Sequence, residues 1–155
     1  MNRSDVQSVD LDNVLKGVKA DLKLPLEESR GEIICHSLPK VIGIESLFHS
    51  IFLNIIHNSV KYKHPDRTPV VTISGQLNER PCNTVTIEVR DNGIGFNPDD
   101  AKHIFDYSFQ CNDEKEGAGI GLGTCTRIIE FLGGSISADS TPGEGSAFFL
   151  HLRTQ

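Results

Sequence analysis

The stretch that decides the fold is Asn54-Ile55-Ile56-His57-Asn58-Ser59-Val60-Lys61-Tyr62. It closes a longer segment, residues 43–62, in which apolar side chains recur with the period of an α-helix. One broad face of this helix carries the apolar or small residues Ile51, Phe52, Ile55, Ile56 and Ser59. The adjoining narrow stripe is polar and consists of Ser50, Asn54, Asn58 and Lys61. The sequence therefore predicts a long helix with one face in a core and a polar stripe along its flank.

Two asparagines one turn apart need an explanation, because asparagine is a poor helix former. The stripe can simply face solvent. Alternatively, an amide oxygen such as that of Asn58 suits Mg²⁺, which prefers oxygen ligands and also takes phosphate oxygens. Lys61 would then offer a compact positive charge to a polyphosphate. Tyr62 would lay its ring beside a ribose or a base.

A second motif, Asp91-Asn92-Gly93-Ile94-Gly95, follows a predicted strand over residues 84–90. An Asp-Asn-Gly sequence is typical of an ordinary turn. Gly95 adds a second interpretation, because glycine permits the backbone to approach a ligand closely. The residues alone leave both interpretations open.

The third motif, Gly117-Ala118-Gly119-Ile120-Gly121-Leu122-Gly123, has glycine at every second position. It follows a polar segment rather than a strand, which argues against a dinucleotide-binding fingerprint, and the chain has no GxxxxGK[ST] phosphate loop. The motif is either a plain hinge or a lid that leads into a helix, whose free N-terminal amides attract phosphates. Phe105 and Phe109, four residues apart, favour simple packing when they are taken alone.

The remaining patterns complete a fold prediction. Residues 1–9 have no pattern and are expected to be a linker or a terminal edge, so that residues 10–155 form one domain. We expect Asp10 to cap a helix over residues 11–22 that Pro25 ends or kinks, a short helix over 98–105, and a helix over 120–132 ended by Gly133-Gly134. Strands are expected at residues 32–35, 70–74, 84–90, 135–138 and 146–152. The predicted class is α+β: a two-layer sandwich, with a mixed, mostly antiparallel sheet of about five strands covered on one face by about three helices.

Composition narrows the functional classes. The 155 residues carry a net charge of −6 without a block of like charges, which argues against binding to nucleic acid or to an anionic membrane surface. The longest apolar run is too short to cross a bilayer, and no signal-peptide pattern opens the chain. The four cysteines form no CxxC pair and are read as reduced thiols of a cytoplasmic protein.

Taken together and in this order, the three motifs resemble the nucleotide pocket of the catalytic and ATP-binding domain of bacterial sensor histidine kinases. That domain shares its Bergerat fold with gyrase, mismatch-repair and heat-shock chaperone ATPases, and the resemblance covers most of the chain. It implies that Asn58 coordinates Mg²⁺ and that Asp91 accepts a hydrogen bond from the adenine amino group, which favours ATP over GTP. Replacing Asp91 by alanine should then nearly abolish nucleotide binding and leave the fold intact. The full set of implied ATP-binding residues is Asn54, Asn58, Lys61, Tyr62, Asp91, Gly93, Gly95, Phe105, Phe109, Lys115, Gly117, Gly119, Ile120, Gly121, Leu122 and Gly123.

In that family the phenylalanines anchor the lid, and many relatives place a basic residue just after the second one. This chain has Gln110 and Cys111 there, so the residue that contacts the γ-phosphate stays open, with Lys115 as a candidate. Asn54 stands where the hydrolysing relatives carry a glutamate. Because an amide cannot take a proton from the attacking water, this favours a phosphotransferase over an ATPase.

The resemblance implies ATP and Mg²⁺ as cofactors and transfer of the γ-phosphoryl group to a histidine on a separate dimerisation domain, with a response regulator as the next partner. None of the six histidines is followed by Asp or Glu, so the phosphoacceptor is expected outside this chain. The isolated chain is expected to be a monomer in the cytoplasm, either free or as part of a membrane-bound sensor. Two rivals stay open: a stand-alone serine kinase of the anti-sigma-factor type, and a degenerate nucleotide-sensing module.

Overall fold

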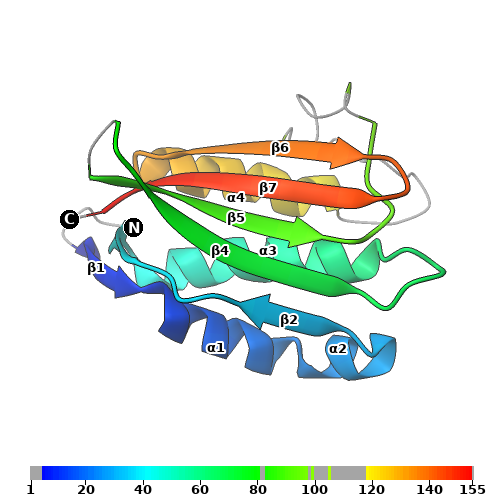
Figure 1. Ribbon diagram of the computed structural model, residues 1–155. Coiled ribbons are helices and arrows are strands. Elements are labelled where there is room, and N and C mark those ends of the chain that lie inside the picture. The colour runs from blue at the N-terminus through cyan, green and yellow to red at the C-terminus, as the bar shows by residue number, and fades with distance from the viewer. Residues whose placement is uncertain (1–4, 81–82, 98, 100–104, 106–117, 155) are drawn as a thin grey trace.

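The computed structural model describes residues 5–80, 83–97, 99, 105 and 118–154. Its main feature is a five-stranded sheet with the strand order β2-β4-β5-β7-β6 (Figure 1). The strands are β2 (Glu32–Cys35), β4 (Val70–Asn78), β5 (Thr84–Asp91), β6 (Ser135–Thr141) and β7 (Gly145–Arg153). The β2–β4 pair is parallel and the other three pairs are antiparallel. The predicted mixed, mostly antiparallel sheet is confirmed.

Alternation along the strands explains why only one face of the sheet is covered. In β5 the side chains of Val85, Ile87 and Val89 are fully buried, and the residues between them are not. Val71 and Ile73 repeat this pattern in the neighbouring β4. An antiparallel sheet with one apolar and one polar face is stable with helices on a single side.

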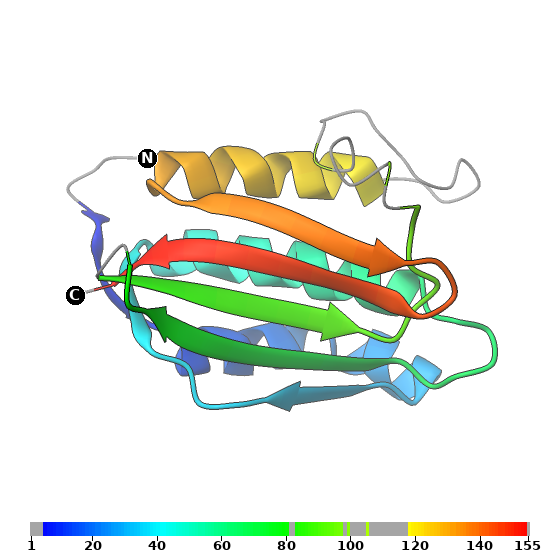
Figure 2. The same cartoon turned by 45° about the horizontal axis from the view of Figure 1, so that its top comes forward.

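The helices form the second layer. Figures 1 and 2 show α1 (Leu11–Asp21), α3 (Glu45–Lys61) and α4 (Ala118–Phe131) side by side on one face of the sheet, with the short α2 (Lys23–Ser29) following α1. The predicted apolar face of α3 lies in the core, where Phe48, Ile51, Phe52, Ile55 and Ile56 are each 0% exposed. The two-layer α+β prediction is therefore confirmed.

Two short strands were not expected. β1 (Gln7–Asp10) pairs antiparallel with β3 (Lys40–Gly43) in a separate two-stranded sheet. Residues up to Val9 were expected to lack structure, yet Val9 is buried together with Val41, its partner across the pair. Because β3 ends at Gly43, the long helix begins at Glu45 rather than at Gly43. The boundary between linker and domain stays a prediction.

The helix ends follow local chemistry. The Asp10 carboxylate accepts a hydrogen bond from the Asp12 N–H over 3.0 Å and caps α1, as predicted. The chain breaks at Leu22 and continues as α2, with Pro25 in its first turn. Gly133, with φ +80°, ends α4 as expected, and the Gly134 N–H donates back to the Ile129 carbonyl over 2.9 Å. None of the helices in the described part of the chain is long and apolar enough to cross a membrane. The expected short helix over 98–105 lies almost wholly outside the described residues.

Candidate functional site

The Asp91 carboxylate is the centre of the best-defined polar site. Asp91 ends β5 and follows the buried Val89 by two residues, so its side chain lies on the face of the sheet that the helices cover. One oxygen, Oδ2, accepts from the Ser59 hydroxyl at 3.0 Å and from the Ser146 hydroxyl at 2.9 Å. The other, Oδ1, accepts from the Gly93 N–H at 2.9 Å and from the Ser146 N–H at 3.3 Å. Three elements, α3, β5 and β7, thus converge on one half-buried carboxylate.

Ser59 has one hydroxyl proton and two acceptors within reach. Its oxygen lies 3.0 Å from Asp91 Oδ2 and 3.1 Å from the Ile55 carbonyl oxygen, and its side chain is buried in α3. A hydroxyl can donate to only one of them at a time. The Ser59 proton can therefore turn from one acceptor to the other without losing its hydrogen bond.

The glycines after Asp91 are required by protein packing. A Cβ on Gly93 would lie 2.7 Å from the Tyr62 carbonyl oxygen, at the end of α3, and the next residue bonds that same oxygen through the Ile94 N–H at 3.0 Å. Gly95 has φ +69°, and a Cβ there would lie 2.5 Å from the Thr141 carbonyl oxygen. This turn therefore approaches α3 and the β6–β7 hairpin closely, and its approach to a ligand stays a prediction.

The polar stripe of α3 continues from this centre. Asn54, Asn58 and Lys61 are partly exposed, in agreement with the predicted flank. The Lys61 ammonium lies 5.8 Å from the centroid of the Tyr62 ring, at the outer limit of a cation–π contact. Within the described part of the chain, no three His, Cys, Asp or Glu side chains form a group that could hold a metal ion. An amide oxygen, together with water and phosphate oxygens, is a donor set that suits Mg²⁺.

Cys125 of α4 lies against α3 beside this stripe. Its thiol is fully buried and donates to the Ile51 carbonyl over 3.7 Å. Burial raises the pKa of the Cys125 thiol to about 12, and a hydrogen bond with the Asn54 side chain partly opposes that rise. The side chain of Asn54 therefore lies within reach of Cys125 on α4. The Cys125 thiol therefore stays protonated at neutral pH.

The other predicted site residues have different surroundings. Leu122 is 7% exposed and belongs to the core, so its side chain packs rather than faces a ligand. The ring of Phe105 lies edge-on to Phe148, with centroids 6.2 Å apart, which is the simple packing expected of it. Gly119, Ile120 and Gly121 lie in the first half of α4, and Gly123 is buried further along it. Phe109, Lys115 and Gly117 lie outside the described residues.

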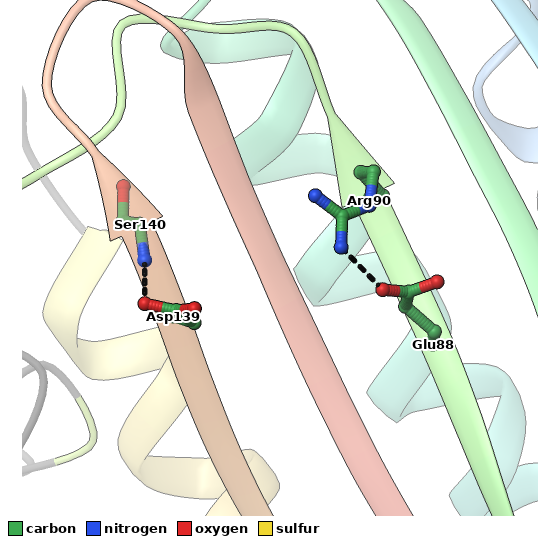
Figure 3. A network of polar contacts seen from close by, with 4 residues as sticks. All are labelled: Glu88, Arg90, Asp139 and Ser140. Atoms are coloured by element: carbon green, nitrogen blue, oxygen red, sulfur yellow. Dashed lines mark hydrogen bonds and ion pairs between the residues drawn. The ribbon is translucent and has the colours of Figure 1, made fainter.

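A hollow of about 340 Å³ lies at the same end of the sheet but on its open face. Its lining includes Thr72, Arg90 and Asp139, which alternate with inward-facing neighbours. Figure 3 shows two contacts beside it: Arg90 pairs with Glu88 at 2.6 Å, and the Asp139 carboxylate accepts from the Ser140 N–H at 2.9 Å. Asp91 and Ser146 also line this hollow, but none of its lining residues belongs to a helix, so it is not the space between Asp91 and the helices.

Sequence reasoning missed three residues: Ser59 and Ser146, which bond Asp91, and Arg67, which donates to the Gly93 carbonyl in the turn after it. Ser59 was assigned to the apolar face of its helix, where a lone hydroxyl could have been noticed. Ser146 meets Asp91 only through the β5–β7 register, which places the two residues opposite each other. Arg67 lies in the connection between α3 and β4, and no pattern in the sequence marks it.

A family model described as "Histidine kinase-, DNA gyrase B-, and HSP90-like ATPase" matches residues 43–155. The chain belongs to this family. Phytochrome-like protein Cph1 of Synechocystis sp. is 36% identical over 146 residues, which cover 92% of this chain and 19% of that protein. Adaptive-response sensory kinase SasA of Prochlorococcus marinus is 34% identical over 146 residues, covering 88% of this chain and 37% of that protein. The chain thus spans well under half the length of these relatives.

Solved structures of this ATPase family agree with the fold. Full-length ShkA in complex with AMPPNP superposes with a TM-score of 0.80 at 25% identity, over 97% of this chain and 32% of that one. The catalytic domain of histidine kinase ThkA superposes with a TM-score of 0.79 at 16% identity, over 96% of this chain and 97% of that one. The second match covers both chains almost completely, so the fold of this chain is that of a histidine-kinase catalytic domain.

Proposed function

We propose that this ATPase-family domain binds Mg-ATP and transfers the γ-phosphoryl group to a histidine on a separate dimerisation domain in two-component signalling. The observation that carries the proposal is the Asp91 carboxylate, held by three elements at the end of β5. Family membership and the AMPPNP complex of ShkA support it. The response regulator is the partner one step further on, and the cytoplasm is the compartment that matches ATP as donor.

In this proposal Asp91 selects the base. Its Oδ2 accepts a hydrogen bond from the adenine 6-amino group, while Ser146 and the Gly93 N–H keep the carboxylate in place. A guanine would present a carbonyl oxygen at that position, and two acceptors facing each other repel. The domain therefore prefers ADP and ATP over GDP and GTP.

The stripe of α3 serves the phosphates. Asn58 gives an amide oxygen to Mg²⁺, which neutralises charge on the phosphates when it is bound. Lys61 leaves the face of Tyr62 and pairs with a phosphate oxygen. Asn54 is an amide and cannot act as a base toward water, so hydrolysis stays slow and the phosphoryl group is kept for the acceptor histidine.

Isothermal titration of the chain with ADP and GDP, with Mg²⁺ and with EDTA, tests the binding half. We expect ADP to bind at least about tenfold more tightly than GDP, which corresponds to a hydrogen bond to a charged group of roughly 1.5 kcal/mol. Equal affinities would remove the base-selecting role from Asp91.

Incubation with γ-labelled ATP tests the transfer half. The isolated chain should stay unlabelled, and a histidine-bearing dimerisation domain added in trans should acquire an acid-labile label. Acid-stable label would favour the serine-kinase rival, and fast turnover without a partner would indicate a dedicated ATPase. A chain that binds no nucleotide would be an interaction module.

A further inference from the structure

Arg67 forms hydrogen bonds to two separate turns near Asp91, the turn that follows Asp91 and the turn between β6 and β7. Its Nε donates to the Asn92 carbonyl at 3.2 Å, and its Nη2 donates to the Gly93 carbonyl at 3.2 Å. The same Nη2 donates to the Gly143 carbonyl at 2.7 Å, in the turn between β6 and β7. Hydrogen bonds from a guanidinium to a carbonyl are charge-assisted and therefore stronger than neutral ones.

These two turns carry the groups that hold Asp91. The Gly93 N–H is one donor to the carboxylate, and Ser146, three residues after Gly143, supplies two more. The turns also bond each other directly, because the Gly143 N–H donates to the Ile94 carbonyl at 2.7 Å. A group that holds these two turns at a set distance therefore also holds the Gly93 and Ser146 donors in place around Asp91.

The connection that bears Arg67 is itself anchored to the first turn. The Asn92 side chain accepts from the Val70 N–H at 2.8 Å and donates to the Thr68 carbonyl at 3.0 Å. The backbone around Arg67 and the turn after Asp91 are therefore held in register from both sides. From this position the planar guanidinium can bond carbonyls in two directions, which the ammonium of a lysine does less well.

We propose that Arg67 is a positioning residue for base recognition: by bonding the Asn92, Gly93 and Gly143 carbonyls, it holds the two turns at the spacing at which Ser146 and Gly93 orient Asp91. It does not touch the nucleotide. The inference deepens the proposed function, because it assumes that Asp91 reads adenine. Its consequence is that Arg67 sets the preference for an amino over a carbonyl group at the 6-position of the purine.

The test compares ADP with IDP, whose base differs at that 6-position, in the chain as it exists. Arg67→Met keeps most of the stem and removes the guanidinium. Arg153→Met is the matched control, because Arg153 is exposed and ends β7 far from Gly145. We expect the parent to prefer ADP by about tenfold or more. In Arg67→Met this preference should fall severalfold, mostly through weaker ADP binding, and in Arg153→Met it should stay unchanged.

A second readout separates positioning from general destabilisation. Amide hydrogen exchange should accelerate at Ile94 and Gly143 in Arg67→Met, and it should not change at Ile87 in the middle of β5. If Arg67→Met does not fold, Arg67→Lys takes its place, with a smaller loss of preference expected. A folded variant with the parent's ADP-to-IDP ratio would overturn the proposal, as would equal weakening of both nucleotides. A parent without any preference for ADP would instead reject the proposed function, and this proposal with it, before any variant is made.

Discussion

Asp91→Asn separates the two tasks of the central carboxylate, because it keeps the shape of the side chain and removes one acceptor. The Gly93 and Ser146 N–H groups can only donate, so the amide oxygen of the new residue must take the place of Oδ1. The new NH₂ group then takes the place of Oδ2. There it can donate to the Ser146 hydroxyl oxygen, which accepts as readily as it donates.

The magnitudes follow from this exchange. The fold keeps a partner for both backbone N–H groups, so stability should fall by only about 1 kcal/mol, or roughly 2–4 °C in Tm. The adenine amino group, in contrast, loses a charged acceptor and meets a donor. Such a loss costs about 1.5–3 kcal/mol, or roughly 10- to 150-fold in ADP affinity. IDP, whose 6-carbonyl can accept from the new NH₂ group, should lose little or gain.

Asp91→Ala should lower stability more than Asp91→Asn does. The hydrogen bonds of Asp91 therefore replace the expectation that the fold stays intact in this variant. The substitution leaves two backbone N–H groups without their acceptor, at about 1–2 kcal/mol each. For a domain of this size the Tm should then fall by roughly 5–15 °C.

The assay is calorimetric titration with ADP and IDP, together with thermal unfolding. Asp139→Asn is the matched control, because that carboxylate is exposed on the open face of the sheet. An Asp91→Asn variant that binds ADP as tightly as the parent would refute the reasoning. A variant that loses as much stability as Asp91→Ala would refute the assignment of the amide orientation.

Three further outcomes are expected. Asn58→Ala should weaken ADP binding in Mg²⁺ and change little in EDTA; equal affinity of variant and parent in Mg²⁺ would remove Asn58 from the site. Gly95→Ala should destabilise by at least about 2 kcal/mol, more than Gly143→Ala, because both need positive φ but only Gly95 lacks room for a Cβ; equal unfolding midpoints would contradict this. The pKa of the Cys125 thiol is about 12 in the folded protein, whereas the unfolded thiol loses its proton near pH 9. The contribution of Cys125 to the free energy of unfolding is therefore complete below pH 9 and falls by about 1.4 kcal/mol per pH unit above it. Unfolding from pH 8 to 11 should show a shallower loss in Cys125→Ser, and parallel curves would argue against the raised pKa.

Periodicity explains which parts of the fold were predictable. The apolar face of α3 and the alternation in β5 each repeat over several residues, and each repeat points to the same face. β1 and β3 span four residues each and form a separate two-stranded sheet that the strand pattern of the main sheet does not imply. Their pairing depends on contacts between distant segments, such as Val9 with Val41.

The same distinction applies to the site. Asp91 and the asparagines of α3 stand in recognisable motifs, so the sequence predicted them as candidates. Ser146 and Arg67 reach the site only through strand register and loop geometry, which one sequence does not reveal. The sequence also could not show which groups leave no room for a side chain at Gly93 and Gly95. These groups are the Tyr62 and Thr141 carbonyls, which come from distant segments of the chain.

In the proposed function, Ser59 accounts for how a carboxylate with four donors can still receive the adenine amino group. The four bonds occupy the four lone-pair positions of Asp91, so an adenine amino group needs one of them released. The two N–H groups belong to fixed backbone and cannot turn away. The Ser59 proton can, because the Ile55 carbonyl lies at nearly the same distance as the carboxylate oxygen. The exchange leaves both the hydroxyl and the carboxylate fully bonded, so the site can be satisfied without nucleotide and still admit an amino group at little cost.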